Sequence, residues 1–210
     1  MAEVKQNGVI VSPSTGSGDT ILQVKAETAN RGNRVAQTAT FEVEGAGVVE
    51  KKQFVAKHLP AAEFISFDNT KPAVDKHGGT ITLTGQSNSQ KITFSKGTGD
   101  IIKANIAAIK FTANGAEATS GIAISGDPGA KAKYGFSLTL TAAENETIQA
   151  RTQQIIATVN GGQRATATLN QTAGDPFIEV IPTSVDVPQN GSTVQVTVDT
   201  NTTFTVTPKS

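Results

Sequence analysis

The stretch "STVQVTVDTN", residues 192–201, decides the fold class. Val194, Val196 and Val198 alternate along it with polar residues, which is the period of a β-strand that is buried on one face. The same alternation runs through "GTITLTG" (79–85), "FSLTLTA" (136–142) and "RATATLNQ" (164–171), and turn signals such as "NGG" and "SGDPG" separate these segments. We therefore predict an all-β protein built as a sandwich of many short strands.

One segment, "GDIIKANIAAIKFTANGAEA" at 99–118, fits this description less well. Ile102, Ile106 and Ile109 have the spacing of a helix, whereas Ile101, Ile109 and Phe111 suit a strand that leaves a turn. Both a short helix and a strand with a loop remain open at this point.

Two units of the sequence occur twice. Residues 64–88 align without a gap with 177–201, so that Phe64 matches Phe177 and Asn88 matches Asn201. A second unit near the N-terminus parallels residues 135–173, with Leu22 opposite Leu138 and Arg34 opposite Arg151. With the first unit named the front half and the second the back half, the order along the chain is back, front, back, front.

The order of these motifs resembles the BACON domain, an immunoglobulin-like β-sandwich of Bacteroidetes proteins and their phages. The resemblance is carried by "VSPSTGSGDT" (11–20), a hairpin that ends in "TLNQTA" (168–173), and "IEVIPTSVDVPQNGSTVQVTVDTNTTFTV" (178–206). Two features depart from the family pattern: Phe204 stands near its usual Trp, and "FVAKH" (54–58) replaces its closing strand.

The resemblance implies tandem immunoglobulin-like (BACON-like) sandwiches. Residues 1–60 are then the back half of one sandwich, 61–175 a complete sandwich with an insertion near 99–120, and 176–210 the front half of another. Each terminal half would leave strand edges and an apolar face uncovered, and such small sheets are marginal alone in water.

Composition argues against several partners and chemistries. The chain has 18 basic and 18 acidic residues and no cysteine, so we expect no nucleic-acid partner, no disulfide and no thiolate site. "MAEVKQNGV" lacks the pattern of a signal peptide and no apolar run has membrane-spanning length, so we expect synthesis in the cytoplasm and no membrane partner.

Catalytic and metal-binding motifs are not found in the sequence either. His58 and His77 are the only histidines, and neither has a second histidine or an acidic cluster beside it. The acidic turns "SGDPG" and "TGD" supply single carboxylates, which suit backbone turns better than a Ca²⁺ site. We predict a protein that is not an enzyme and that has no cofactor, no metal and no catalytic residues.

Two classes of function remain open. The resemblance implies a structural virion protein, such as an auxiliary or decoration capsid protein of a crAss-like bacteriophage, whose partners are other copies of itself and a major capsid or other virion protein. The alternative is an extracellular or cell-surface adhesion or glycan-binding module. Sugars stack on exposed aromatic rings, and Tyr134 is the only tyrosine, so it is the candidate glycan contact.

The back, front, back, front order predicts complementation between subunits. We expect residues 176–210 of one chain to complete residues 1–60 of the next, because short linkers disfavour pairing within one chain. The predicted contact joins Val194, Val196, Val198 and Phe204 to Phe41 and Val43. Pairing within one chain and self-sufficient terminal halves are the alternatives.

Overall fold

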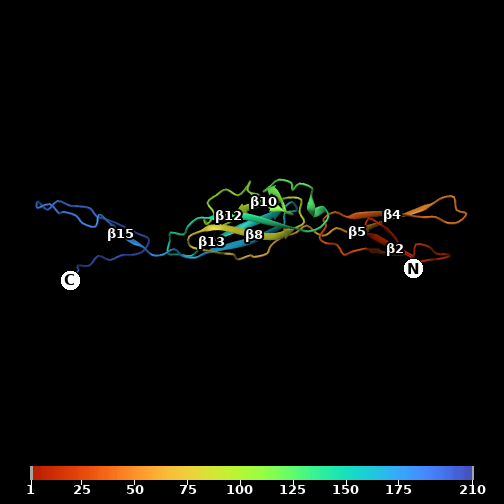
Figure 1. The fold of residues 1–210 in the computed structure, drawn as a ribbon, viewed down its shortest axis with the longest axis horizontal. Coiled ribbons are helices and arrows are strands. Elements are labelled where there is room, and N and C mark those ends of the chain that lie inside the picture. Colours follow the sequence, from red (N-terminus) through yellow and green to blue (C-terminus); the bar gives the residue numbers. More distant parts are fainter. Residues whose placement is uncertain (1, 210) are drawn as a thin grey trace.

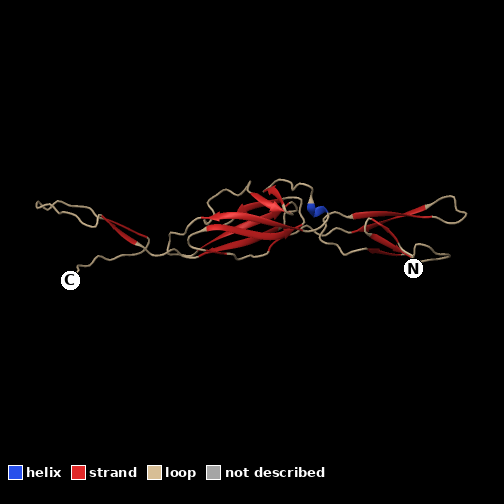
Figure 2. Cartoon of the chain, viewed as in Figure 1, coloured by secondary structure: helices blue, strands red, loops and turns tan. Residues whose placement is uncertain are grey.

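The chain is all-β, as the sequence predicts. The computed structural model describes residues 2–209, in which the regular elements are strands and one 3₁₀ turn, η1 (Pro128–Ala130) (Figure 2). The strands fall into three groups along one long axis (Figure 1), and they pair only within a group. We call residues 2–60 the N-terminal unit, 61–175 the central domain and 176–209 the C-terminal unit.

The N-terminal unit consists of two small antiparallel sheets that face each other. One sheet contains β1 (Val4–Gln6), β2 (Val9–Ser12) and β3 (Gln23–Ala26), and the other contains β4 (Gln37–Val43) and β5 (Lys52–His58). Alternating residues of β2 and β4 point inward, so Val9 and Val11 pack against Ala39 and Phe41. This small cluster is the core of the unit.

The central domain is a closed sandwich. Its five-stranded sheet has the order β11-β10-β12-β8-β6, and its four-stranded sheet has the order β7-β14-β13-β9. The strands are β6 (Ile65–Phe67), β7 (Ala73–Val74), β8 (Gly79–Ser87), β9 (Ile92–Lys96), β10 (Lys110–Ala113), β11 (Ala116–Thr119), β12 (Tyr134–Ala142), β13 (Arg151–Val159) and β14 (Arg164–Gln171). Inward residues of both sheets form one core, in which Phe94, Leu138 and Leu169 are completely buried.

The segment that the sequence left open is a loop followed by a hairpin. Ile101, Ile102 and Ile106 are buried in the core without forming a helix. The side-chain Oε1 of Gln153, on β13, accepts the backbone N–H groups of Ile101 and Ile102 at 2.8 and 2.5 Å. The apolar spacing there serves a loop that is held by a neighbouring strand, so the strand-and-loop interpretation is correct.

The hairpin that follows has the sequence signature of its turn. Asn114 and Gly115 connect β10 to β11 with φ values of 50° and 78°. Positive φ at both central positions is the type I′ geometry that fits the twist of two antiparallel strands. Phe111 on β10 is thereby placed in the core of the sandwich.

The C-terminal unit repeats the first hairpin of the central domain in the same register. β15 (Ile178–Ile181) pairs with β16 (Thr197–Thr200), with Val180 opposite Val198. β6 pairs with β8 in the central domain, with Phe67 opposite Gly85. These positions match at the offset that aligns Phe64 with Phe177, so the repeated sequence forms the same pairing twice.

The predicted strand at 192–201 is shorter than its sequence pattern suggests. β16 begins only at Thr197, whereas β8 extends over the whole equivalent stretch, Gly79–Ser87. Residues 79–83 of β8 pair with β12 alone, and no counterpart of β12 lies beside β16 within residues 2–209. Residues 192–196 are therefore irregular because a strand needs a neighbour for its backbone groups.

The second repeat needs a correction of its register. The β4–β5 ladder starts at Gln37 opposite His58, and the β13–β14 ladder starts at Arg151 opposite Gln171. Arg151 therefore corresponds to Gln37, and the predicted match of Arg34 with Arg151 is wrong. The loop before β4 is longer than the loop before β13, so matching residue type across it shifted the alignment.

Candidate functional site

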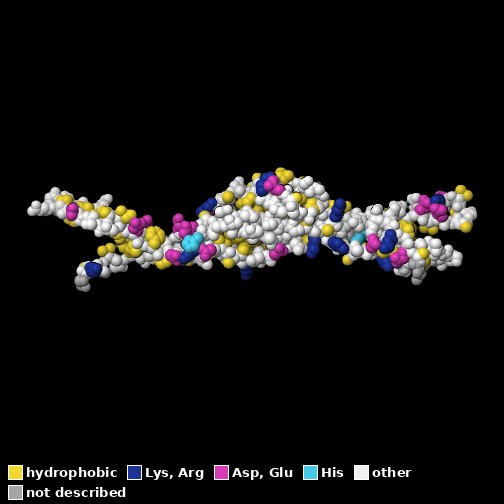
Figure 3. Space-filling view, in the orientation of Figure 1, with side chains coloured by type: hydrophobic (Ala, Val, Ile, Leu, Met, Phe, Trp, Pro, Cys, Tyr) yellow, Lys and Arg dark blue, Asp and Glu magenta, His cyan; other side chains and the backbone are white. Residues whose placement is uncertain are grey.

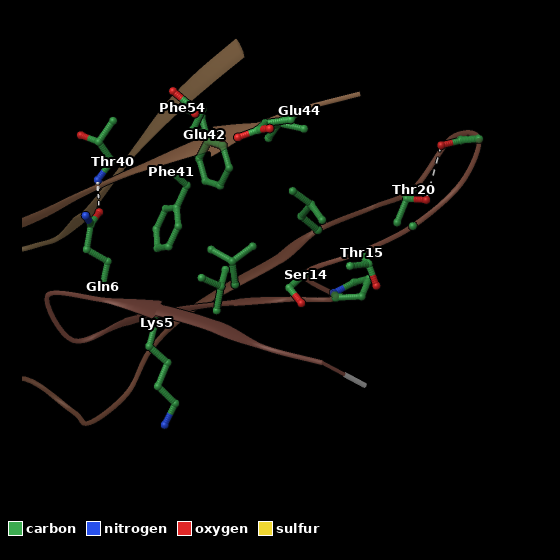
Figure 4. A pocket seen from close by; sticks show the side chains of 17 residues that line it. Lys5, Gln6, Ser14, Thr15, Thr20, Thr40, Phe41, Glu42, Glu44 and Phe54 are labelled. Carbon is green, nitrogen blue, oxygen red and sulfur yellow. Dashed lines mark hydrogen bonds between the residues drawn. The ribbon is translucent and has the colours of Figure 1, made fainter. Parts of the chain in front are cut away.

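The sheets of the N-terminal unit diverge and leave an open groove. It has a volume of about 660 Å³, and its apolar lining includes Leu22, Phe41, Val43 and Phe54 (Figure 4). Phe41 points from β4 toward β2, and its ring stacks with that of Phe54 at a centroid distance of 5.3 Å. The groove thus has one aromatic wall and one wall built from β1, β2 and the loop that follows.

A second opening of about 500 Å³ lies between the other edges of the same two sheets. Val24 and Ala26 of β3 and Ala56 of β5 line it. In the central domain, β8 and β6 extend the sheet beyond β12, the counterpart of β3, and β6 packs on β14, the counterpart of β5. The second opening is therefore where a front half lies in the complete sandwich.

Solvent reaches β3 at positions that are core in the central domain. Leu22 and Val24 correspond to Leu138 and Leu140 in the repeat. Leu138, inside β12, is 0% exposed, and Leu22, which directly precedes β3, is 38% exposed, although the repeat places the two leucines at equivalent positions. The difference follows from the neighbours, because β8 lies beside β12 and no described strand lies at the same side of β3.

Backbone hydrogen bonds identify which edge of β3 is free. The N–H of Glu27 donates to the carbonyl of Gly8 at 2.7 Å, and the equivalent N–H of Ala143 donates to Ile101 at 2.9 Å. Ile101 lies on the side of β12 away from β8, so β2 occupies the side of β3 that β10 and the insertion occupy on β12. The free edge of β3 is the one that corresponds to the β8-facing edge.

The C-terminal unit exposes the complementary surface. Val180, Val187, Val194 and Val196 repeat apolar positions of the front half and are exposed, and Figure 3 shows hydrophobic side chains gathered around β15. Val196 is 43% exposed, whereas its counterpart Leu83 is 2% exposed. β16 has β15 on one side, and no strand within residues 2–209 lies on the side where β8 has β12.

The residues predicted for complementation lie at opposite ends of the chain. Phe41 is buried in the N-terminal unit and Val43 beside it is half exposed. Val194, Val196 and Phe204 are exposed on the C-terminal unit, and Val198 is partly buried. The central domain separates the two units (Figure 1), so one chain does not bring the two sets together.

Asparagines hold both junctions between neighbouring units. The side-chain amide of Asn88 donates to Gly32 of the N-terminal unit (2.9 Å) and to Ala62 of the linker (2.8 Å). Asn201 donates in the same way to Glu146 of the central domain (2.8 Å) and to Asp175 of the linker (2.9 Å). The C-terminal unit is thus attached to the central domain as the central domain is attached to the N-terminal unit.

These junctions were not identified from the sequence, although the repeat aligns the two asparagines. Each side-chain oxygen also accepts the N–H of the repeated phenylalanine, at 2.9 Å in Phe64 and 3.1 Å in Phe177. The identity of Asn88 and Asn201 in an otherwise divergent repeat was the available signal.

Tyr134 is not available as a stacking surface for a sugar. Its side chain is 4% exposed, and its hydroxyl donates to the carbonyl of Ser89 at 2.7 Å. Burial raises the pKa of this phenol to about 12. The predicted glycan contact is thus a core residue, because strand alternation turns it inward at the start of β12.

The acidic turns considered for Ca²⁺ use their carboxylates in ion pairs. The Nη2 of Arg34 donates to both carboxylate oxygens of Asp127, at 2.6 and 2.5 Å. This ion pair raises the pKa of the guanidinium and joins the N-terminal unit to the central domain. Asp100 pairs with Lys103. His77 lies 3.4 Å from Glu144 on the surface.

Residues 2–209 contain no group of three or more His, Asp or Glu side chains placed to hold a metal ion. No helix in the same residues has the length and apolar character to cross a membrane. No protein-family model and no curated protein matches this sequence.

Proposed function

We propose that the protein is a non-enzymatic structural protein that assembles through protein–protein contacts at its two ends. The observation that carries this proposal is the pair of open apolar faces on the terminal units, at opposite ends of an elongated chain (Figure 1). Exposed apolar faces with unpaired strand edges mark surfaces that another polypeptide covers. The closed central domain then acts as a spacer between two contact surfaces.

The resemblance to BACON domains extends the proposal to a location. We assign the protein to a virion, as an auxiliary or decoration component of a crAss-like bacteriophage capsid, with a major capsid or other virion protein as a partner. The order of the motifs along the chain supports this assignment. The burial of Tyr134 weighs against the glycan-binding alternative, because the only tyrosine offers no exposed ring.

Quantitative mass spectrometry of purified particles tests the proposal. We expect the protein in the particles at a copy number near a multiple of the capsid symmetry, and no signal on a glycan array. Absence from particles together with binding of a defined oligosaccharide would contradict the proposal and favour an adhesin.

A further inference from the structure

We infer that each open face is covered by a second copy of this chain, and that strands pair between the copies in the register of the central domain. The C-terminal unit of one chain adds β15 and β16 to the free edge of β3 in the next chain. This inference rests on the proposed function only in treating the open faces as contact surfaces.

The strand orders of the two terminal units combine into that of the central domain. β3 is the edge strand of β1-β2-β3, and its free edge corresponds to the β8-facing edge of β12. β16 is the edge strand of β15-β16, and its free edge corresponds to the β12-facing edge of β8. Joining the two edges gives β1-β2-β3-β16-β15, which matches β11-β10-β12-β8-β6.

The repeats fix the register of this joined sheet. Leu138 lies opposite Leu83 in the β12–β8 ladder, and their counterparts are Leu22 and Val196. Extending the same register along both strands pairs inward-facing residues only. The predicted contacts between chains are Thr20–Val198, Leu22–Val196, Val24–Val194 and Ala26–Ser192.

In the predicted Thr20–Val198 contact, the larger and the smaller residue lie on opposite strands from those of the equivalent pair in the central domain. Gly85 lies opposite Phe136 in the central domain, and a Cβ at Gly85 would approach the phenylalanine ring to 2.5 Å. The counterpart of Gly85 is Val198, and the counterpart of Phe136 is Thr20. A larger residue on one strand is thus matched by a smaller one on the other, as residues that share a core volume require.

The same alignment of the repeats also brings together two residues of opposite charge, Lys57 of one chain and Asp186 of the other. Asn170 of β14 lies beside Ala73 of β7, and their counterparts are Lys57 and Asp186. Neither Lys57 nor Asp186 forms an ion pair within residues 2–209. An exposed pair of this kind adds little affinity but favours the correct register.

The positions of the two units in one chain determine the kind of assembly. They lie at opposite ends of the central domain (Figure 1), so complementation occurs between chains and is head-to-tail. The asparagine contacts of Asn88 and Asn201 are equivalent at the two junctions, so we expect each added chain to continue along a similar axis. The product is an open chain in which complete and composite sandwiches alternate.

Cysteine crosslinking tests this register, because the chain has no native cysteine. Gln23 and Gln195 are the counterparts of Thr139 and Thr82, which lie opposite each other on the outer face. The carbonyl of Thr84 accepts from Asp68 on the β6 side, so the backbone groups of Thr82 also point away from β12, and Thr82 and Thr139 form a non-hydrogen-bonded pair. Pairs of this kind bring the Cβ atoms close enough for a disulfide. Oxidising a mixture of full-length Gln23→Cys and Gln195→Cys chains should give a covalent dimer, and the double variant should give a ladder of multimers.

Two matched controls accompany the crosslink. Thr82→Cys with Thr139→Cys in one chain should form an internal disulfide, which shows that the oxidation works at this type of pair. Gln23→Cys mixed with Thr82→Cys should not crosslink, because β12 already occupies that edge of β8. A Gln23–Gln195 yield no higher than this second mixture, or an equal yield of Gln23→Cys chains with themselves, would overturn the inference.

Sedimentation of the full chain gives a second readout without cysteines. Val196→Asp places a charge on the face predicted to be buried and should weaken self-association by about 100-fold or more. Gln195→Asp, on the opposite face of the same stretch, should change it by less than about fivefold. Equal effects of the two variants, or a wild-type chain that stays monomeric at high concentration, would overturn the inference.

These outcomes separate the inference from the proposed function. A monomeric chain that is stoichiometric in particles would remove the self-pairing and leave the structural role. A chain that crosslinks at Gln23 and Gln195 but is absent from particles would keep the self-pairing and remove the virion assignment.

Discussion

The central domain and the terminal units are built from the same repeated sequence, yet only the central domain is closed. β12 and β8 pair along nine residues in the centre, whereas β3 and β16 are four-residue strands with one free edge each. The residues are similar in kind, so the difference arises from whether the complementary half is adjacent. Burial in this protein is therefore a property of the pair of halves and not of either half.

The largest difference in stability between the two regions is expected when the equivalent leucines, Leu138 in the central domain and Leu22 in the N-terminal unit, are truncated to alanine. Leu138→Ala should lower the free energy of unfolding by about 2–5 kcal/mol, because it leaves a cavity in a closed core. Leu22→Ala should cost less than about 1 kcal/mol in the dilute monomer, because water already reaches that side chain. Denaturant unfolding is followed by the fluorescence of Tyr134, the only tyrosine in a chain without tryptophan, which reports on the central domain, and by circular dichroism for the whole chain.

If the two leucine variants lower the free energy of unfolding equally in dilute solution, the N-terminal unit is closed by itself. At concentrations where chains associate, the cost of Leu22→Ala should rise toward that of Leu138→Ala. This concentration dependence is absent from a self-sufficient unit.

Sequence patterns predicted the strands well wherever both neighbours of a strand are present in the same chain. β8, β12 and β14 follow their alternating segments closely, because each of them has a neighbouring strand at both of its edges. The pattern at 192–196 is equally regular and yet forms no strand, because alternation reports which face is apolar and not whether a partner is adjacent.

The candidate site was only partly accessible to sequence reasoning. Val43, Val194 and Val196 were identified as apolar residues of incomplete halves, and the structure places them on open faces. The free edge of β3 depends on the direction of individual N–H groups, which no periodicity reveals. Tyr134 was misjudged because its rarity suggested a function, whereas its position on β12 determines its burial.

A second pair of variants compares Gly85 with its counterpart Val198, where the central domain has a small residue and the C-terminal unit a larger one. Gly85→Ala should destabilise the central domain by about 1–3 kcal/mol, because a Cβ there meets the Phe136 ring and the Ser66 carbonyl. Val198→Ala at the equivalent position should cost about 1 kcal/mol or less in the monomer. Thermal unfolding of both variants beside the wild type measures the difference, and a neutral Gly85→Ala would contradict the tight approach of β8 and β12.

Removing the junction asparagine should also cost more stability at Asn88, in the central domain, than at Asn201, in the C-terminal unit. Asn88 is completely buried, so Asn88→Ala leaves backbone groups without partners and should cost about 1–3 kcal/mol. Asn201 is partly exposed and water can replace its bonds, so Asn201→Ala should cost less than about 1 kcal/mol. Small-angle scattering should also show a wider range of end-to-end lengths in both variants, since each amide bridges two units. Unchanged scattering would mean that the linkers alone set the orientation.

The smallest effect concerns a group that the terminal units lack. Burial raises the pKa of Tyr134 from 10.0 to about 12, so the folded chain holds the phenolic proton more tightly than the unfolded chain does. The resulting stability is fully present below about pH 10 and is lost as the pH rises from there through the folded pKa. Tyr134→Phe removes the hydrogen bond to Ser89, at a cost of about 0.5–1.5 kcal/mol at pH 8, and also removes this loss of stability at alkaline pH.

Unfolding midpoints by circular dichroism at pH 8 and pH 11 should therefore lie closer together in Tyr134→Phe than in the wild type. Lysines titrate in both proteins and cancel in this comparison, so an equal fall in midpoint would mean that the Tyr134 hydroxyl is not protected in the folded state.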